Sequence, residues 1–224
     1  MTLVIFDLDD TLLNGDSATL FCQFLVDKQL AAPSLMQGDE DFYLKYQDGS
    51  LCIASYVRFM LAPIDHLSQV EISVLLAEFV SDYIAPNIYP QAHELLEQLA
   101  TQNERVLLIS ATVEFIVKAI AEHLGIDNVL AIELEAKTMA TNGCFGYSGE
   151  IKGVASFREG KVTRLLQWLD NTDEGLIGAS FYSDSYNDLA LLQLVDNPIT
   201  VNPDVSLREH AINKGWPIID WRNN

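Results

Sequence analysis

Basic residues are scarce in this chain. Its 224 residues include 13 lysines and arginines against 32 aspartates and glutamates, which gives a formal net charge of −19 at pH 7. Nucleic acids and anionic membranes repel a protein this acidic, so neither is expected as a partner. The same charge repels a phosphorylated ligand at long range. Any phosphate site in this chain therefore needs a local positive centre, such as a metal ion or a specific lysine.

Cysteines and long apolar runs are also scarce. The three cysteines, Cys22, Cys52 and Cys144, are far apart and form no C-x-x-C pair, which argues against a zinc site and favours a reducing compartment. The N-terminus offers one short apolar strand and then acids, unlike a signal peptide. No apolar run approaches the ~18 residues that a membrane span needs. We therefore expect a cytoplasmic protein, whose oligomeric state the sequence leaves open.

Apolar strands and amphipathic helices alternate over most of the chain. The expected strands are 2–7, 105–110, 129–134, 179–183, 199–202 and 216–219. The expected helices among the later strands are 91–102, 113–124, 161–169, 187–195 and 205–214, and a Gly-rich hairpin is expected around 142–153. Strands that alternate with helices predict an α/β fold with a doubly wound parallel sheet.

The region from about 16 to 84 differs from the rest, because it holds no convincing strand. The expected helices there are 18–30, 51–61 and 67–84. We expect a core domain of residues 1–14 and 86–224 and an α-helical cap domain of residues 15–85. Because the insertion follows the first strand directly, the cap is expected to lie over the carboxyl edge of the sheet.

The first strand ends on acids. The run Val4-Ile5-Phe6-Asp7-Leu8-Asp9-Asp10-Thr11 delivers Asp7 and Asp9 to the carboxyl edge, where open α/β sheets bind ligands. Asp7 can attack a phosphorus atom and form an aspartyl-phosphate. Asp9 points to the opposite side of an extended backbone, so it can protonate the leaving oxygen and later deprotonate water. Carboxylates repel a phosphate dianion, so Mg²⁺, which prefers oxygen ligands, is the expected cofactor.

Later segments supply the remaining groups. Ser110 ends a predicted strand, where its hydroxyl could hold a phosphate oxygen, and Lys161 opens a helix, where its ammonium could meet the phosphoryl oxygens. Asp184 and Asp188 follow another strand, four residues apart and therefore on one face if a helix starts there. Asp184 is the expected side-chain ligand of the metal, beside a carboxylate oxygen of Asp7 and the backbone carbonyl of Asp9.

These four pieces, in this order, resemble the four motifs of the haloacid dehalogenase (HAD) superfamily: D-x-D-x-T, a strand-ending Ser, a Lys, and the acidic pair of S-D-S-x-x-D. The resemblance covers nearly the whole chain and is greatest to phosphoserine-phosphatase-like members, whose helical cap is inserted at this point. It implies a Mg²⁺-dependent phosphomonoesterase. It also implies that Asp188 supports Lys161 and the water shell of the metal, and that Thr11 and Asn187 help to hold the phosphate.

Substrate choice is expected to come from the cap. In the phosphoserine-phosphatase-like pattern an acid at the position of Asp16 faces the ammonium of the substrate. Arg58, the only arginine of the cap, would suit a carboxylate as a bidentate partner, and a solvated surface arginine is the alternative. We expect a small amino-bearing phosphate ester as the ligand. Histidinol phosphate is favoured over phosphoserine because S-D-S-Y-N-D replaces a Gly-rich last motif and because Asn14-Gly15-Asp16-Ser17 resembles histidinol-phosphatases.

Other classes of protein fit the chain less well. A receiver-type signalling domain would be about half as long and would lack the helical insertion. A non-catalytic phosphate-binding module would not need Asp9, nor would a dehalogenase, which has no phosphate leaving group to protonate. Cys52 and Arg58 satisfy the C-x5-R spacing of cysteine-dependent phosphatases. That stretch has no glycine and is expected to be helical, which would turn the two side chains ~240° apart.

Overall fold

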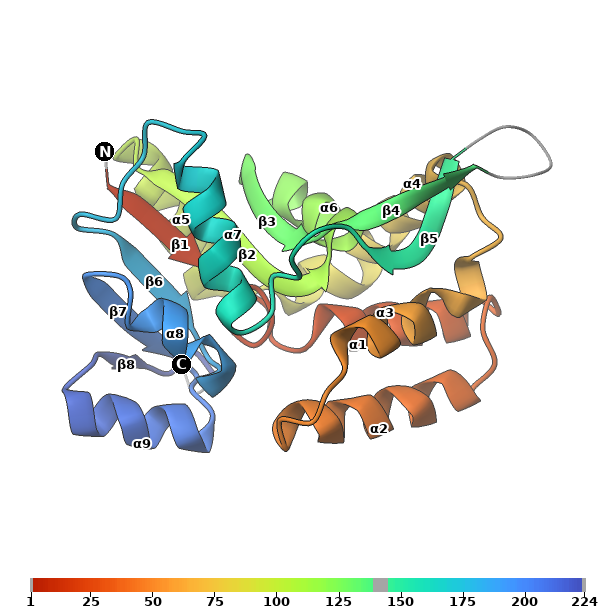
Figure 1. The fold of residues 1–224 in the computed structure, drawn as a ribbon, viewed down its shortest axis with the longest axis horizontal. Coiled ribbons are helices and arrows are strands. Elements are labelled where there is room, and N and C mark those ends of the chain that lie inside the picture. The colour runs from red at the N-terminus through yellow and green to blue at the C-terminus, as the bar shows by residue number, and fades with distance from the viewer. Residues whose placement is uncertain (1, 139–144, 223–224) are drawn as a thin grey trace.

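The computed structural model describes residues 2–138 and 145–222. A six-stranded sheet with the order β3-β2-β1-β6-β7-β8 forms its centre (Figure 1). The strands are β1 (Leu3–Phe6), β2 (Arg105–Val113), β3 (Asn128–Ile132), β6 (Ser180–Ser183), β7 (Asn197–Val201) and β8 (Ile218–Ile219). All five neighbouring pairs are parallel. The chain winds outward from β1 to β3 and then returns to β6 on the other side of β1, so the predicted doubly wound α/β fold is confirmed.

The two faces of the sheet bury alternate residues of β1. Val4 and Phe6 pack into a cluster with α5 (Pro90–Thr101) and α6 (Glu114–Leu124), and this cluster continues into the helical insertion. Leu3 and Ile5 pack on the opposite face. The helices that contribute to this second cluster are α7 (Glu159–Leu169), α8 (Leu189–Leu192) and α9 (Val205–Lys214). Both faces are covered, so β1 reads as an uninterrupted apolar run that stops only at Asp7.

Between β1 and α5, residues 15–87 form only helices, turns and short loops, and we call this segment the cap. Its helices are α1 (Ser17–Asp27), α2 (Ser34–Gln47), α3 (Ile53–Leu61) and α4 (Gln69–Phe79), followed by a π turn (Val80–Ile84) and a 3-10 turn (Ala85–Asn87). Phe21, Phe24 and Phe79 form its aromatic centre, with the Phe21 and Phe79 rings edge-on at 5.2 Å. Helix α2 is absent from the helices expected from the sequence, because only Leu35 and Asp39 of it are buried and its apolar period is weak.

An antiparallel hairpin of β4 (Leu134–Thr138) and β5 (Phe145–Ile151) leaves the sheet after β3. The sequence predicts the hairpin at 142–153, which is wrong for its first strand, because β4 lies at Leu134–Thr138. Residues 142–144, including Cys144, lie outside the described residues. The predicted strand 129–134 extends too far, because β3 ends at Ile132 and β4 begins at Leu134. Glu133, between the two strands, forms ion pairs with Arg164 and Lys152. β5 packs against α3 and α4, so a segment from beyond residue 86 lies on the cap (Figure 1).

Within residues 2–138 and 145–222, no single helix is long and apolar enough to cross a bilayer. A bent pair, Ile53–Ile64 and Gln69–Asn87, satisfies that criterion only when its two parts, which meet at 94°, are joined. The core helices of soluble proteins meet the same criterion.

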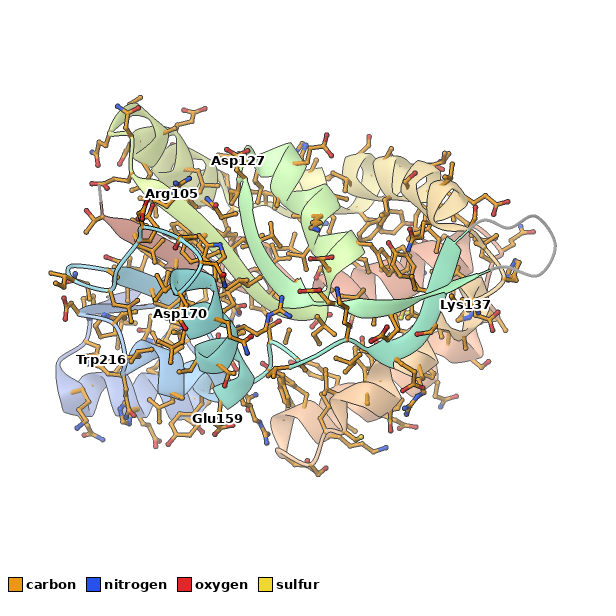
Figure 2. The ribbon with its side chains drawn as sticks, turned by 45° about the horizontal axis from the view of Figure 1, so that its top comes forward. Arg105, Asp127, Lys137, Glu159, Asp170 and Trp216 are labelled. Carbon is orange, nitrogen blue, oxygen red and sulfur yellow. The ribbon has the colours of Figure 1, made fainter. Side chains whose placement is uncertain are left out.

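The first turn of α7 depends on a glycine. Gly160 donates its N–H to the Phe157 carbonyl at 2.9 Å, and a Cβ added to Gly160 would lie 2.0 Å from the Ala155 carbonyl oxygen. That separation is far below van der Waals contact, and the obstacle is backbone that cannot rotate away. Any other residue at this position must therefore displace the start of α7. The same turn positions Lys161 at the sheet edge. Figure 2 labels Glu159 and Asp170, at the two ends of this helix.

We expect Gly160→Ala to lower the free energy of unfolding by about 1–3 kcal/mol, since overpacking forces a backbone shift. Urea denaturation measures it. Gly175→Ala is the matched control, because Gly175 has a negative φ and an added Cβ would meet nothing within 4 Å. The control is expected to change stability by less than about 0.5 kcal/mol. Equal effects of the two substitutions would contradict the close contact at Gly160.

Candidate active site

A cavity of about 520 Å³ lies between the cap and the carboxyl edge of the sheet. Its floor comes from the loops that follow β1 and β6 and from the start of α7, and its walls come from α1, α2 and α3. Of the residues expected to carry chemistry, those that line it are Asp7, Asp9, Asp16, Lys161, Asp184, Asn187 and Asp188. Three segments that are distant in sequence, residues 7–16, Lys161 and residues 184–188, therefore meet at this one place.

Lys161 forms the centre of the floor. Its Nζ donates to Asp7 Oδ1 at 2.8 Å and to Asp188 Oδ2 at 2.7 Å, and the residue is only 3% exposed. Burial alone would lower the pKa of Lys161, but the charges of Asp188 and Asp7 outweigh it and raise the pKa above its usual value. Burial raises the pKa of Asp7 to about 6, with Lys161 opposing the shift. Lys161 is therefore positively charged at neutral pH and faces an ionised Asp7.

Asp9 has different partners from Asp7. Its Oδ1 accepts a hydrogen bond from the Ser17 backbone N–H at 2.6 Å, and its Oδ2 accepts one from Thr112 Oγ1 at 3.2 Å. Burial raises the pKa of Asp9 well above its usual value, and the charges of Asp16 and Asp7 add to the shift. A raised pKa favours the protonated carboxyl, which is the form that a general acid needs.

Asp184 lies beside this group. Thr11 Oγ1 donates to Asp184 Oδ1 at 3.3 Å. Burial raises the pKa of Asp184, and the nearby charges of Asp7, Asp10 and Asp188 raise it further, while Lys161 lowers it. Negative charge thus exceeds positive charge at this edge of the sheet. Such a surplus is relieved either by protons or by a bound cation.

The residues present fit Mg²⁺. The carboxylates of Asp7 and Asp184 and the backbone carbonyl of Asp9 are hard oxygen ligands. In the part of the chain that the structure describes, no group of three or more His, Cys, Asp or Glu side chains is arranged to hold a metal. Two carboxylates and a backbone carbonyl suit Mg²⁺, which takes oxygen ligands and keeps several waters, better than zinc, whose structural sites use Cys and His.

Asp16 caps the first cap helix at the rim of the cavity. Its Oδ1 accepts from the Thr19 N–H at 2.8 Å. Burial raises the pKa of Asp16 to about 6, and the charges of Asp39 and Asp10 add to the shift. Asp39 is 3% exposed and accepts hydrogen bonds from Thr19 Oγ1 and the Tyr56 hydroxyl at 2.7 and 2.8 Å. The cap therefore presents two carboxylates to the cavity.

Three expected residues do not line the cavity. Thr11, expected to help hold the phosphate, is fully buried and donates to Asp184 instead. Ser110 does not end its strand, because β2 continues to Val113; its buried hydroxyl accepts from the Thr112 N–H at 3.1 Å, and Thr112 lines the cavity in its place. Arg58 does not line the cavity. Helix α3 turns it toward β5, where its guanidinium binds both carboxylate oxygens of Glu150 at 3.0 and 2.8 Å. The expectation of a substrate contact for Arg58 is therefore not supported.

Other residues of the cavity were missed. Arg158 lines it and precedes Lys161 in the run Arg158-Glu159-Gly160-Lys161, a proximity that was readable in the sequence. Asp39 was missed because its helix was not singled out. Asp10 also lines the cavity. Its carboxylate binds Arg222 at 3.1 Å and its carbonyl accepts from Asn202 Nδ2 at 3.1 Å.

The motifs and the sheet match a known family. A family model described as haloacid dehalogenase-like hydrolase matches residues 4–193. The chain belongs to this family. The resemblance inferred from the four motifs is thus confirmed, and the protein is an enzyme of the haloacid dehalogenase-like hydrolase family. The rival C-x5-R interpretation has no support, because α3 begins one residue after Cys52 and includes Arg58.

Individual relatives cover nearly all of this hydrolase. A histidinol-phosphatase of Neisseria meningitidis is 40% identical, over 98% of this chain and 99% of the relative. A phosphoserine phosphatase of Mycobacterium tuberculosis is 30% identical, over 97% of this chain and 70% of the relative. A protein of unknown function from Bordetella pertussis has a structure with a TM-score of 0.87 and 35% identity, over 99% and 100% of the two chains. A substrate-bound phosphoserine phosphatase shares the fold, with a TM-score of 0.69 and 18% identity, over 97% and 92%.

We expect Asp16→Asn to stabilise this hydrolase at pH 7.5 by about 1–2 kcal/mol. This is less than the raised pKa of Asp16 alone implies, because the residue is partly exposed and solvent screens its charge. The pKa of Asp16 is raised to about 6 by folding, so the contribution of this carboxyl to stability is present at pH 4 and is lost as the pH rises through 6. Asparagine retains the helix cap and does not titrate.

Urea unfolding at pH 4.5, 6 and 7.5 in EDTA measures this gain. Asp41→Asn, at an exposed position of α2, is the control and should change nothing at any of the three pH values. A gain for Asp16→Asn that is the same at pH 4.5 and 7.5 would show that the pKa of Asp16 is not raised.

Proposed function

We propose that this phosphatase of the haloacid dehalogenase family hydrolyses a small phosphate monoester through an aspartyl-phosphate on Asp7, with Mg²⁺ as its cofactor. The observation that carries the proposal is the buried Lys161, which pairs with Asp7 and Asp188 on the floor of a cavity also lined by Asp9 and Asp184. An ion pair with only a structural role would not need Asp9 as a proton-bearing carboxyl or Asp184 as a further acid beside it. A phosphoryl-transfer site needs both.

The chemistry follows from the partners of each carboxyl group. An Asp7 carboxylate oxygen attacks phosphorus and the P–O bond to the leaving group breaks, while Asp9 gives its proton to the leaving oxygen. Asp9 then takes a proton from the water that attacks phosphorus, which breaks the bond to Asp7 and releases inorganic phosphate. Lys161 offsets charge on the phosphoryl oxygens. Bound Mg²⁺, held by Asp7, Asp184 and the Asp9 carbonyl, would offset the rest of that charge.

The acidic wall of the cap favours a cationic leaving group. Asp16 and Asp39 face the cavity, and Arg158, an arginine of the cavity, already binds an Asn187 oxygen and the Gly49 carbonyl. Histidinol phosphate carries an ammonium and an imidazole and no carboxylate, so it suits these charges better than phosphoserine does. The relative from Neisseria supports this choice. Phosphoserine is the second candidate, supported by the mycobacterial relative.

We expect the wild-type protein to hydrolyse p-nitrophenyl phosphate with Mg²⁺ and to lose activity in EDTA. Asp7→Asn should lower kcat by at least about a thousandfold, since the nucleophile is gone. Asp9→Asn should release one equivalent of p-nitrophenolate, a leaving group that needs no proton, and then stop. Rapid-mixing absorbance measures this burst. Full turnover by Asp7→Asn would overturn the aspartyl-phosphate mechanism.

We expect kcat/KM to be highest for histidinol phosphate, lower for phosphoserine and lowest for sugar phosphates. Asp16→Asn should raise the KM for histidinol phosphate by about 10–100-fold, the usual worth of a hydrogen-bonded charge. It should leave p-nitrophenyl phosphate within about threefold, because that ester has no ammonium. Asp41→Asn serves again as the control. A preference for sugar phosphates that Asp16→Asn does not alter would refute the amino-bearing substrate.

A further inference from the structure

Two contacts between the cap and the core converge on the loop after β6. The Tyr46 hydroxyl, near the end of α2, hydrogen-bonds Ser185 Oγ at 3.0 Å. Arg158 spans the second contact: its Nε donates to Asn187 Oδ1 at 3.0 Å, and its Nη2 donates to the Gly49 carbonyl at 3.1 Å. Ser185 Oγ also accepts the Asn187 backbone N–H at 3.2 Å. The same short loop is thus held by one cap segment at two points.

Arg158 is fixed from several sides. Its backbone has a φ of 53° immediately before α7, and its guanidinium lies 4.9 Å from the centre of the Phe157 ring. The Phe157 ring in turn lies 6.1 Å from that of Tyr46. On the cap side, Gly49 has a φ of 80°, and a Cβ there would lie 3.1 Å from Arg158 Nη2. Glycine therefore lets the cap carbonyl approach the guanidinium.

The guanidinium selects one orientation of the Asn187 amide. Arginine has five N–H donors and no acceptor, so only the oxygen of the amide can face it. The NH₂ group of Asn187, on the other branch of the amide, donates one hydrogen bond to the Tyr46 hydroxyl. Its second N–H remains for a ligand in the cavity that Asn187 lines. A phosphate oxygen accepts hydrogen bonds and cannot donate them when ionised. An amide turned the other way would therefore present the wrong group.

We propose that Arg158 is a positioning residue of the reaction. It turns the Asn187 NH₂ toward the phosphate, and the cap loop at Gly49 holds Arg158 in place, so closure of the cap and readiness of the phosphate site are coupled. This inference rests on the proposed phosphatase function. Because Asn187 faces the part shared by all phosphate esters, loss of Arg158 should affect every substrate by the same factor, unlike loss of Asp16.

A double-mutant cycle tests the inference, with Arg158→Gln, Asn187→Ala and the double variant assayed on histidinol phosphate and p-nitrophenyl phosphate. We expect Arg158→Gln to lower kcat/KM about tenfold on both substrates, because glutamine can also accept a hydrogen bond and so permits the wrong amide orientation. In the Asn187→Ala background the same change should cost less than about twofold. Arg158→Lys, again only a donor, should keep activity within about threefold of wild type.

The matched control is Arg105→Gln, which removes an exposed arginine that pairs with Glu174 at the amino end of β2, the end of that strand far from the cavity (Figure 2). Its kcat/KM should equal that of wild type. Effects of Arg158→Gln and Asn187→Ala that multiply in the double variant, or an Arg158→Gln effect no larger than that of Arg105→Gln, would overturn the positioning role. An inactive wild type would instead overturn the proposed function. Thermal melts identify any variant that fails to fold. If Arg158→Gln is one of them, the activity of Arg158→Lys tests the positioning role in its place.

Discussion

Lys161 carries a positive charge into a part of the protein from which water is largely excluded. A buried ammonium is unstable unless its three donors find acceptors, and here Asp7 and Asp188 supply two of them at 2.8 and 2.7 Å. Ser183 Oγ donates to the same Asp188 oxygen that binds Lys161, at 2.8 Å. The end of β1, the loop after β6 and the first turn of α7 are all tied together through this one ion.

This arrangement limits what the rest of the site can be. The lysine neutralises only part of the charge of Asp7, Asp184 and Asp188, so burial and the neighbouring carboxylates together raise the pKa of Asp184. The site is therefore unfavourable when it is empty and at neutral pH, and a divalent cation or protons relieve it. Stability has been given up for reactivity at this edge, as is usual where like charges are held together.

The sequence predicts the floor of the site better than its walls. Asp7, Asp9, Lys161 and Asp184 each stand at the start or end of a strand or helix with a clear apolar pattern, so their convergence follows from a parallel sheet. The walls come from long-range packing. The local sequence does not show which of Arg58 and Arg158 faces the cavity. Arg58 faces Glu150 instead because α3 packs against β5, and these two residues are 92 positions apart in the chain.

Helix α2 shows the same limit. It buries so few of its residues that no period is visible, yet it contributes Asp39 and Tyr46 to the cavity. Ser110 shows a different limit of the sequence prediction. The strand that became β2 was identified, but its end was predicted three residues too early, since β2 continues to Val113. Boundaries of strands depend on neighbouring strands and loops, which a local pattern does not contain.

The hairpin of β4 and β5 makes the cap a composite of two separate stretches of chain. One wall of its packing comes from the insertion after β1, and the other from a segment that follows β3. Exchange of the insertion alone between two relatives would thus bring a foreign α3 against a native β5 and break the Arg58–Glu150 pair. The packing of the cap in such a protein is inherited as two co-adapted segments, and recombination between relatives preserves it only when both are exchanged together.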